Sequence, residues 1–297
     1  MKVRFAPSPT GGLHPGNARI AVFNWLYAKH NDAKLLLRIE DTDVERSSSE
    51  HERSIIQDLE WLGIDWDEGP IRQSERFDIY NDSINELIKS GYLYKCYCTD
   101  EELELERKAQ LASDRPPKYS GKCKAIKEEK NLPFVLRFDV NKYSQDKGFK
   151  ELKFFDIVKN KELSCETALI GDIVLLRNDS SPTYNFAVVV DDAKMGVTHV
   201  FRGEDHVSNT FKQMMLFDVL GLKIPEYGHL PILLAKDRTK LSKRSGGIPI
   251  HEYRAMGILP DAVFNHLSLL GGMYPSIDEA CSREELIKSF DHTTSAS

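Results

Sequence analysis

The chain has 297 residues, of which 41% are hydrophobic and 29% charged, and its formal net charge is −6. These values are typical of a soluble protein with more than one domain. No apolar run reaches about eighteen residues, and the first residues lack the apolar core of a secretory signal, so we expect neither a membrane span nor export. Five cysteines, an odd number, argue against a disulfide framework and favour a reducing cytoplasm.

The first third of the chain alternates between strand and helix patterns. Short apolar runs, typical of buried strands, are separated by longer segments with apolar side chains at helical spacing. In chain order the expected elements are strand 2–6, helix 14–30, strand 35–39, helix 47–62, a helix around 75–90 and strand 92–98. Strands that alternate with helices indicate parallel β-α-β units, so the sequence predicts an α/β fold with a doubly wound parallel sheet.

The pattern changes between residues 99 and 182. A charged helix over 100–110 leads to short strands at 134–138 and 173–177, which indicates an inserted α+β module. The strand–helix alternation then resumes over 184–191, 198–202, 206–220 and 229–234, and the chain is helical after residue 244. The expected domains are a discontinuous nucleotide-binding domain (1–98 and 183–245), the inserted module (99–182) and a helical segment (246–297).

A glycine-rich turn links the first strand to the first helix, over Pro7-Ser-Pro-Thr-Gly-Gly-Leu-His14-Pro-Gly16-Asn17. Glycines allow a ligand to approach the backbone closely, and N–H groups at a helix N-terminus attract phosphate. His14 stands where the helix begins, so its ring is placed to reach such a phosphate. Pro15 suits the first helical turn. Taken alone, the segment favours an ordinary strand-to-helix turn with a capping histidine.

A second phosphate-binding pattern lies near the end of the chain, in Lys240-Leu-Ser-Lys243-Arg244. Two ammonium groups and a guanidinium on a serine-containing loop suit a polyphosphate. Residues 236–254 carry six basic and two acidic side chains, so this edge attracts anions although the whole chain is acidic. Net charge therefore neither supports nor excludes RNA binding. Together with the glycine-rich turn, the loop favours a nucleotide site.

Charged side chains also stand where three of the expected strands end. Glu40 follows the strand at 35–39, at the edge where doubly wound sheets bind ligands, and its carboxylate can hold an ammonium group. Arg4 closes the first strand and Arg202 a later one, and arginine can bind a carboxylate through two hydrogen bonds. Tyr184 can add a hydroxyl. Each arginine alone is typical of a surface salt bridge, but the set favours a ligand pocket.

These segments, in this order, resemble the motifs of bacterial glutamyl-tRNA synthetases, which are class I aminoacyl-tRNA synthetases. The family patterns are RxAPSPTGxxHxGN, LRIEDTD, SPTYNFAxVVDD, THVxRGEDHxxNT and KLSKR. They stand here at Arg4–Asn17, Leu37–Asp43, Ser181–Asp192, Thr198–Thr210 and Lys240–Arg244. Glutaminyl-tRNA synthetases match less well, because their first motif usually reads PEP rather than PSP. The resemblance implies a Rossmann-type sheet with an inserted acceptor-arm-binding module and a C-terminal helical segment.

The resemblance also implies which residues form the site. Those implied to contact glutamate are Arg4, Ala6, Ser8, Glu40, Tyr184 and Arg202. Those implied to contact ATP are His14, Gly16, Asn17, Lys240, Leu241 and Lys243, with His14 and Lys243 as the catalytic pair. Glutamate has two carboxylates and one ammonium group, so its pocket needs two cations and one anion. Arg4, Arg202 and Glu40 would supply them.

The implied reaction has two steps and needs no side-chain nucleophile. The α-carboxylate of L-glutamate attacks the α-phosphate of ATP, with Mg²⁺ assisting, and the 3′-terminal hydroxyl of tRNA(Glu) then takes the acyl group. Catalysis would rest on positioning and on cationic stabilisation of the reacting phosphate. The resemblance and the composition together predict a cytoplasmic monomer with no membrane contact.

Two other functions stay open. Full-length relatives continue into helical stem-contact and anticodon-binding domains, so the resemblance implies a truncated or naturally short form. A glutamyl-queuosine tRNA(Asp) synthetase, a shorter paralogue, fits this length, although the LRIEDTD and GEDHxxNT matches oppose it. The non-enzymatic alternative is a synthetase-like RNA-binding protein with a decayed active site, indicated only by Pro15 in the first motif.

The cysteines form a further candidate site. Cys96 and Cys98 alternate along a strand and face the same way, and a returning loop can bring Cys123 to them. Some members of the family hold zinc at Cys-x-Cys and a later Cys-x-His, but Ala125 stands at the last position here. In a shorter relative a tyrosine serves as the ligand, and Tyr119 has suitable spacing. Zinc on these four residues and three reduced cysteines near a strand edge are both consistent with the sequence.

Overall fold

The parallel sheet consists of two groups of strands that meet at β1. The structure is a computed structural model that describes residues 1–43, 45–126, 128, 130–233, 248–270 and 280–293. The first group is β1 (Lys2–Phe5), β2 (Lys34–Ile39) and β3 (Glu68–Arg72), paired in that order. The second contains the parallel pair β9 (His199–Gly203) and β10 (Glu226–Leu230). The backbone N–H of Thr198 donates to the carbonyl of Lys2 at 2.9 Å, which joins the start of β9 to β1.

Taken across this contact, the strands of the two groups stand in the order β3-β2-β1-β9-β10. The chain first moves outward from β1 to β3 and later returns to the opposite side of β1 with β9. In doubly wound sheets, such a reversal opens a crevice beyond the carboxyl ends of the strands, and ligands bind there. The doubly wound parallel sheet predicted from the alternation of elements is confirmed.

Helices cover this sheet and connect its strands. They are α1 (Pro15–His30), α2 (Ser49–Trp61), α3 (Phe77–Lys89), α6 (Tyr184–Lys194) and α7 (Val207–Val219). Helix α1 begins at a proline, whose missing N–H costs no hydrogen bond in the first turn. Most of α1 is buried because it packs between the sheet and the C-terminal helices. The rings of Phe23 and Tyr27 meet Phe201 of β9 at centroid distances of 4.9 and 4.5 Å.

A smaller antiparallel sheet forms the centre of the segment between the two halves. It consists of β4 (Leu93–Cys96), β5 (Val135–Phe138) and β8 (Ile173–Leu176), in that order. Helices α4 (Asp100–Leu111) and α5 (Val140–Lys147) belong to the same segment. Helix α4 starts with a capping box, in which Thr99 and Glu102 satisfy each other's backbone N–H groups. The short strands expected at 134–138 and 173–177 are confirmed.

Two strands pair differently from the sequence expectation. The sequence predicts the strand over 92–98 to belong to the parallel alternation. In the structure this strand is β4, and it runs antiparallel to β5. Conversely, the hairpin of β6 (Glu151–Asp156) and β7 (Lys161–Glu166) lies within 99–182, yet β6 pairs in parallel with β10. Hydrophobic patterns identify a strand but do not say which sheet edge it joins. The domain limits given above stay a prediction.

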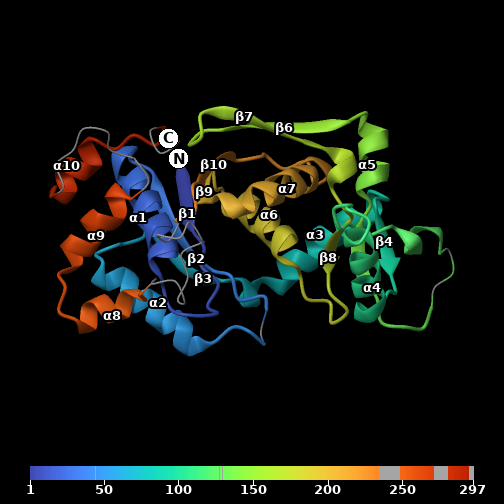
Figure 1. Ribbon diagram of the computed structural model, residues 1–297, viewed down its shortest axis with the longest axis horizontal. Helices are drawn as coiled ribbons and strands as arrows, with labels where there is room; N and C mark the ends of the chain where they lie inside the picture. Colours follow the sequence, from blue (N-terminus) through green and yellow to red (C-terminus); the bar gives the residue numbers. More distant parts are fainter. Residues whose placement is uncertain (44, 127, 129, 234–247, 271–279, 294–297) are drawn as a thin grey trace.

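Short helices follow the parallel sheet, as expected for the end of the chain. They are α8 (Ile250–Ala255), α9 (Pro260–Leu269) and α10 (Arg283–Lys288). Figure 1 shows an elongated molecule, with α1, α2 and these helices at one end, β4 and α4 at the other, and α6 and α7 between them. Within the described residues, no helix combines the length and the apolar character that crossing a membrane requires.

Candidate active site

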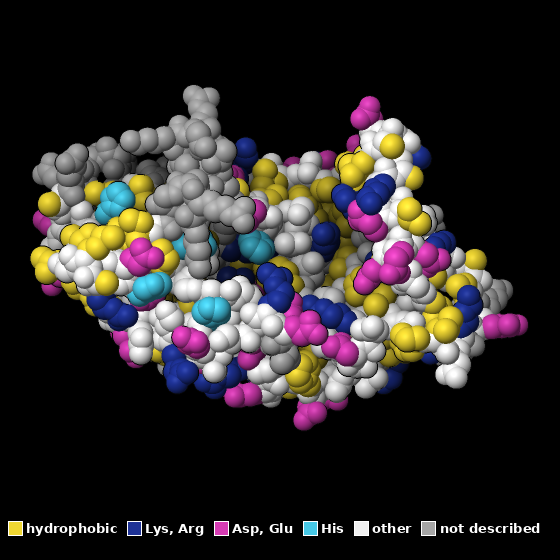
Figure 2. Space-filling model, turned by 60° about the horizontal axis from the view of Figure 1, so that its bottom comes forward, with side chains coloured by type: hydrophobic (Ala, Val, Ile, Leu, Met, Phe, Trp, Pro, Cys, Tyr) yellow, Lys and Arg dark blue, Asp and Glu magenta, His cyan; other side chains and the backbone are white. Residues whose placement is uncertain are grey.

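A polar cavity opens at the point where the strand order reverses. Its volume is about 450 Å³, and most of the residues that line it lie in or just after the carboxyl ends of β1, β2 and β9 or begin α6. This is the position at which a doubly wound sheet is expected to bind its ligand. Figure 2 shows a hollow near the middle of one face of the molecule, with basic and histidine side chains gathered around it.

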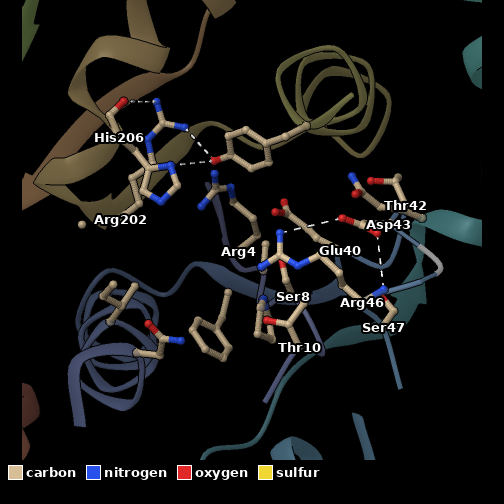
Figure 3. A pocket seen from close by; sticks show the side chains of 18 of the residues that line it. Arg4, Ser8, Thr10, Glu40, Thr42, Asp43, Arg46, Ser47, Arg202 and His206 are labelled. Carbon is tan, nitrogen blue, oxygen red and sulfur yellow. Dashed lines mark hydrogen bonds and ion pairs between the residues drawn. The ribbon is translucent and has the colours of Figure 1, made fainter. Parts of the chain in front are cut away.

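All of the residues implied to contact glutamate line this cavity. They are Arg4, Ala6, Ser8, Glu40, Tyr184 and Arg202. In Figure 3, Arg4 lies between Arg202 on one side and Glu40 on the other. The fold therefore brings two guanidinium groups and one carboxylate to a single cavity from three different strands.

On the Glu40 side, a buried network of ion pairs surrounds the cavity wall. Arg38 of β2 is fully buried, and its guanidinium nitrogens lie 2.7 Å from Asp192 Oδ1 and 3.0 Å from Glu40 Oε1. Arg4 Nε donates to the same Asp192 oxygen at 3.3 Å. Asp192 comes from α6 and so connects that helix to both strands. Arg38 and Asp192 hold Arg4 and Glu40 in place from behind.

A second carboxylate, Asp191, extends this network towards the segment that follows β3. It accepts hydrogen bonds of 2.8 Å each from Gln73, Arg76 and Tyr80. Arg38 Nε lies 3.9 Å from it. Gln73 and Arg76 belong to the 3₁₀ turn η1 (Gln73–Arg76) after β3, and Tyr80 to α3. Because a buried charge needs partners, these contacts fix α6 against the segment that follows β3.

On the opposite side, Arg202 is held by neutral groups. Its Nη1 donates to Gln213 Oε1 at 3.0 Å and to the Tyr184 hydroxyl at 3.4 Å, and its Nη2 donates to Thr210 Oγ1 at 2.7 Å. Its Nε donates to His229 Nε2 at 3.2 Å. Among the described residues, no carboxylate forms an ion pair with this guanidinium. Its positive charge is therefore not neutralised locally and can attract an anionic ligand.

Burial sets the protonation states at the cavity. It raises the pKa of Glu40 despite the opposing effects of nearby guanidinium groups, first that of Arg38. Burial, together with the charge of Arg202, lowers the pKa of His206 to about 4, so this ring is neutral at pH 7. The Nδ1 atom of His206 lies 3.2 Å from the Tyr184 hydroxyl. Tyr184 is thus held between a neutral imidazole and a cation.

The glycine-rich turn places His14 at the start of α1. The backbone N–H of Gly16 donates to His14 Nδ1 at 3.1 Å. A Cβ atom at Gly16 would come within 3.0 Å of that ring, so only glycine permits this cap without displacing the ring. Asn17 lines the cavity, whereas His14 and Gly16 are not among the described residues that line it. The imidazole lies at a helix N-terminus, where phosphate binding is favoured.

The remaining predicted ATP contacts, Lys240, Leu241 and Lys243, lie outside the described residues. Several lining residues were missed by sequence reasoning: Thr10, Thr42, Asp43, Arg46, Ser47, Arg177 and His206. Thr10, Thr42, Asp43 and His206 lie inside the motif segments, and Arg46 and Ser47 soon follow one of them. This position in the chain was the signal that could have found them. Arg177 had no such signal, because it follows β8 of the other sheet.

The three cysteines of the second candidate site come together. Their sulfur atoms all lie within 4.8 Å of one another, and Cys98 Sγ is 3.5 Å from Cys123 Sγ. The Tyr119 hydroxyl lies 3.3 Å from the sulfur atoms of both Cys96 and Cys98. Arg137 stacks over the Tyr119 ring at 4.2 Å. Three sulfur atoms and one phenol oxygen thus lie close together, and four donors is the number that a tetrahedral metal site takes.

Comparisons with known proteins identify the family of this chain. The family model "tRNA synthetases class I (E and Q), catalytic domain" matches residues 1–297. The glutamate–tRNA ligase of Aquifex aeolicus is 50% identical, over 98% of this chain and 62% of its own length. That of a Sulfurihydrogenibium strain is 49% identical, over 97% of this chain and 62% of its own length. The chain thus spans less than two thirds of the length of these relatives.

A solved structure is similar over nearly the whole chain. The crystal structure of the glutamate–tRNA synthetase from Elizabethkingia anophelis has a TM-score of 0.87 at 32% identity, and the similarity covers 99% of this chain and 66% of that one. A glutamate–tRNA ligase from Elizabethkingia meningosepticum, described in complex with its amino acid, gives the same TM-score and identity and is covered to 65%.

Proposed function

This chain belongs to the class I tRNA synthetases (E and Q), catalytic domain, and we propose from this premise that it catalyses the ATP-dependent attachment of L-glutamate to tRNA(Glu). The observation that carries the proposal is the charge pattern of the cavity. Two buried guanidinium groups and one buried carboxylate match the two carboxylates and the ammonium group of glutamate.

The two ends of the amino acid are assigned by the partners of each charged group. Arg202 has neutral partners and receives the side-chain carboxylate, with the Tyr184 hydroxyl beside it. Glu40 receives the ammonium group. Glutamine would place an uncharged amide against Arg202 and leave its charge unmatched in a buried site, so the cavity favours the acid over the amide. The side chain of Arg202 therefore sets the amino acid specificity.

The reaction then needs the α-carboxylate and the nucleotide to be held in contact. ATP, its triphosphate neutralised by Mg²⁺, binds at the N-terminus of α1 beside His14, Gly16 and Asn17. Lys240, Leu241 and Lys243 are proposed to complete that site, as the motif resemblance implies. The His14 ring, whose Nδ1 accepts the backbone N–H of Gly16, donates towards the α-phosphate. The ammonium of Lys243 stabilises the charge that develops on this phosphate. No covalent enzyme intermediate is needed.

Glutamate-dependent exchange of pyrophosphate into ATP tests this function. The exchange and the charging reaction are measured with tRNA(Glu), with queuosine-containing tRNA(Asp) and without tRNA, and a full-length relative serves as the positive control. Charging of tRNA(Glu) is expected. Charging of queuosine-containing tRNA(Asp) alone would identify the paralogous synthetase instead. If the control is active but this chain neither exchanges nor charges with any tRNA, the catalytic proposal is wrong.

The three cysteines and Tyr119 are proposed to bind zinc. The three sulfur atoms lie within 4.8 Å of one another, and the Tyr119 hydroxyl lies 3.3 Å from two of them. This hydroxyl also accepts a hydrogen bond of 3.1 Å from the backbone N–H of Cys123. Bound zinc would fix the start of α4 to β4 and leave the cavity unchanged. We expect about one zinc ion per chain by elemental analysis, and a loss of zinc in Cys98→Ser. Cys165→Ser, which alters a cysteine outside this cluster, should retain it; equal zinc content in both variants would refute the site.

The remaining assignments extend the same proposal. The segment over 99–182 is proposed to meet the acceptor arm of the tRNA, because it lies beside the cavity through Arg177. The domain over 1–98 and 183–245 would bind the small substrates, and residues 246–297 would begin the stem-contact part. We expect the chain to act in the cytoplasm as a monomer. Analytical ultracentrifugation with and without tRNA tests the last expectation.

A further inference from the structure

A buried carboxylate and a buried imidazole stand in line behind Arg202. Asp156 ends β6 and His229 lies in β10, and both side chains are fully buried. His229 Nδ1 is 2.7 Å from Asp156 Oδ2, and His229 Nε2 is 3.2 Å from Arg202 Nε. Neither residue is among the described residues that line the cavity. The three side chains therefore form a continuous chain of contacts that reaches the cavity only through Arg202.

The hydrogen-bond chemistry of this chain allows one arrangement of protons. Arginine only donates, so His229 Nε2 must accept from Arg202 Nε and carries no hydrogen. A neutral imidazole has its hydrogen on the other nitrogen, so Nδ1–H donates to Asp156. Thr210 Oγ1, at 3.1 Å from Nε2, is also compatible with an accepting nitrogen. Burial lowers the pKa of His229, which keeps the ring neutral at pH 7.

Asp156 is itself held in one orientation. Its Oδ1 accepts backbone N–H groups from Val158 at 3.1 Å, Lys159 at 2.9 Å and His229 at 3.2 Å. The other oxygen, Oδ2, is thereby aimed at the imidazole. Burial alone would raise the pKa of Asp156, but the hydrogen bond from His229 and these backbone bonds outweigh it and lower the pKa. The carboxylate remains ionised and acts as an acceptor at both oxygens.

We propose that Asp156 and His229 are positioning residues for Arg202. Asp156 fixes the Nδ1–H tautomer of His229, and the free Nε2 then orients the guanidinium so that its outer nitrogens face the cavity. The proposal rests on the proposed function in one respect, because it takes Arg202 to bind a carboxylate of the substrate. It also explains why β6, which lies in the segment between the two halves of the sheet, carries a buried acid next to β10.

The variant Asp156→Asn tests this arrangement with almost no change in shape. Its amide oxygen stays on the three backbone N–H groups, so the amide NH₂ faces His229 Nδ1. Nδ1 must then accept, the hydrogen moves to Nε2, and Nε2–H meets Arg202 Nε–H, which also donates. We expect the KM for glutamate to rise about 10- to 100-fold, the loss of one hydrogen bond to a charged group, with the KM for ATP unchanged.

Asp58→Asn is the matched control. Asp58 is also fully buried but lies on α2, and both of its oxygens lack a hydrogen-bond partner among the described residues. The same substitution there should leave both KM values unchanged.

Long-range ¹H–¹⁵N spectra of the histidine rings report the tautomer directly, and His229→Gln identifies the signals of His229 by their loss.

Three results decide the proposal. Wild type should show His229 protonated at Nδ1 and Asp156→Asn at Nε2, with the rise in KM for glutamate. His229→Gln keeps one donor and one acceptor and should retain a low KM, whereas His229→Leu has neither and should raise it. An unchanged tautomer or an unchanged KM in Asp156→Asn overturns the proposal. Wild type without glutamate activity would refute the proposed function instead, while the spectra would still test the tautomer.

Discussion

The two arginines of the cavity have the same burial but opposite surroundings. Arg4 is 4% exposed and Arg202 is 5% exposed. Arg4 touches the carboxylate of Asp192, whereas Arg202 touches an imidazole, two hydroxyls and an amide. Burial alone therefore does not tell which arginine recognises the acidic side chain of the substrate. What distinguishes them is whether the protein has already neutralised the charge.

The Arg4 side is balanced before any ligand arrives. Three guanidinium groups face three carboxylates there, and the six residues are Arg4, Arg38, Arg76, Glu40, Asp191 and Asp192. The Arg202 side has one cation and, among the described residues, no carboxylate partner. We infer that the balanced region holds the cavity in shape and presents Arg4 and Glu40 to the α-carboxylate and the ammonium group, whereas Arg202 recognises the acidic side chain. The predictions below separate shape from recognition.

Asp192→Asn should have the largest effect, and it should fall on stability. The change leaves Arg4 and Arg38 buried with one carboxylate fewer, and breaking such a network costs about 3–5 kcal/mol. We expect the free energy of unfolding in urea to fall by that amount at pH 7, with Asp58→Asn unaffected or slightly more stable, because burial raises the pKa of Asp58 to about 6. Equal stability of wild type and Asp192→Asn would mean that this region is not structural.

The pH dependence of this stability has a definite sign. Burial alone would raise the pKa of Asp192, but Arg4 and Arg38 outweigh burial and hold it below its ordinary value. The stabilisation is therefore present above about pH 3.9 and is lost as the pH falls through the lowered pKa. The difference between wild type and Asp192→Asn should shrink on acidification.

Arg202→Gln should affect recognition instead. It removes the cation that lacks a carboxylate partner, so glutamate loses a charge-assisted contact worth about 3 kcal/mol, or about 10²-fold in kcat/KM. The preference for glutamate over glutamine should shrink in the same variant. Arg177→Gln changes another cavity arginine, which donates to Ser181 and to the carbonyl of Pro182, and should keep the KM for glutamate. If both variants lose the same activity, Arg202 has no special role in recognition.

Sequence reasoning identified the cavity residues that stand at strand ends. Arg4 and Arg202 lie near the carboxyl ends of their strands and Glu40 directly follows its strand. In a doubly wound sheet the carboxyl ends of parallel strands face one crevice. Their side chains could therefore be grouped without knowing any contact. Tyr184, which begins α6, was expected to add its hydroxyl to this group. The motif resemblance added Ala6 and Ser8.

The groups that hold these residues could not be found in the same way. Asp191 and Asp192 end an apolar helical run, and this position was a signal that at least one of them is buried. Asp156 and His229 gave no signal, because their pairing depends on β6 joining β10. A pattern along one strand does not specify its partner strand. The sequence pattern likewise did not specify the partner of β4, and for this reason β4 was expected in the parallel sheet.

The KM for glutamate should also depend on pH through Glu40. Because burial raises the pKa of this carboxyl, it takes up a proton at a pH above the ordinary glutamate value of about 4.3. The neutral form does not hold an ammonium group by charge, so the KM for glutamate should rise as the pH falls. This rise should begin at a higher pH than it would for an exposed carboxyl group. Glu40→Gln should have a high KM that no longer changes over this range. A wild-type KM that is flat to pH 4.5, about the ordinary value, would contradict the assignment.

Thr210→Val should have the smallest effect, and it tests how the neutral groups act on Arg202. Thr210 is fully buried, and its hydroxyl accepts from Arg202 Nη2 at 2.7 Å. Valine keeps the shape, and the backbone carbonyl of His206, at 3.4 Å, remains as an acceptor for the same nitrogen. The loss should therefore be about 1 kcal/mol, or roughly fivefold in the KM for glutamate. Thr167→Val, a buried hydroxyl that donates to the carbonyls of Phe149 and Lys150, should leave this KM unchanged. If Thr210→Val costs as much as Arg202→Gln, the neutral groups do more than orient the guanidinium, and the contrast between the two arginines rests on more than local charge.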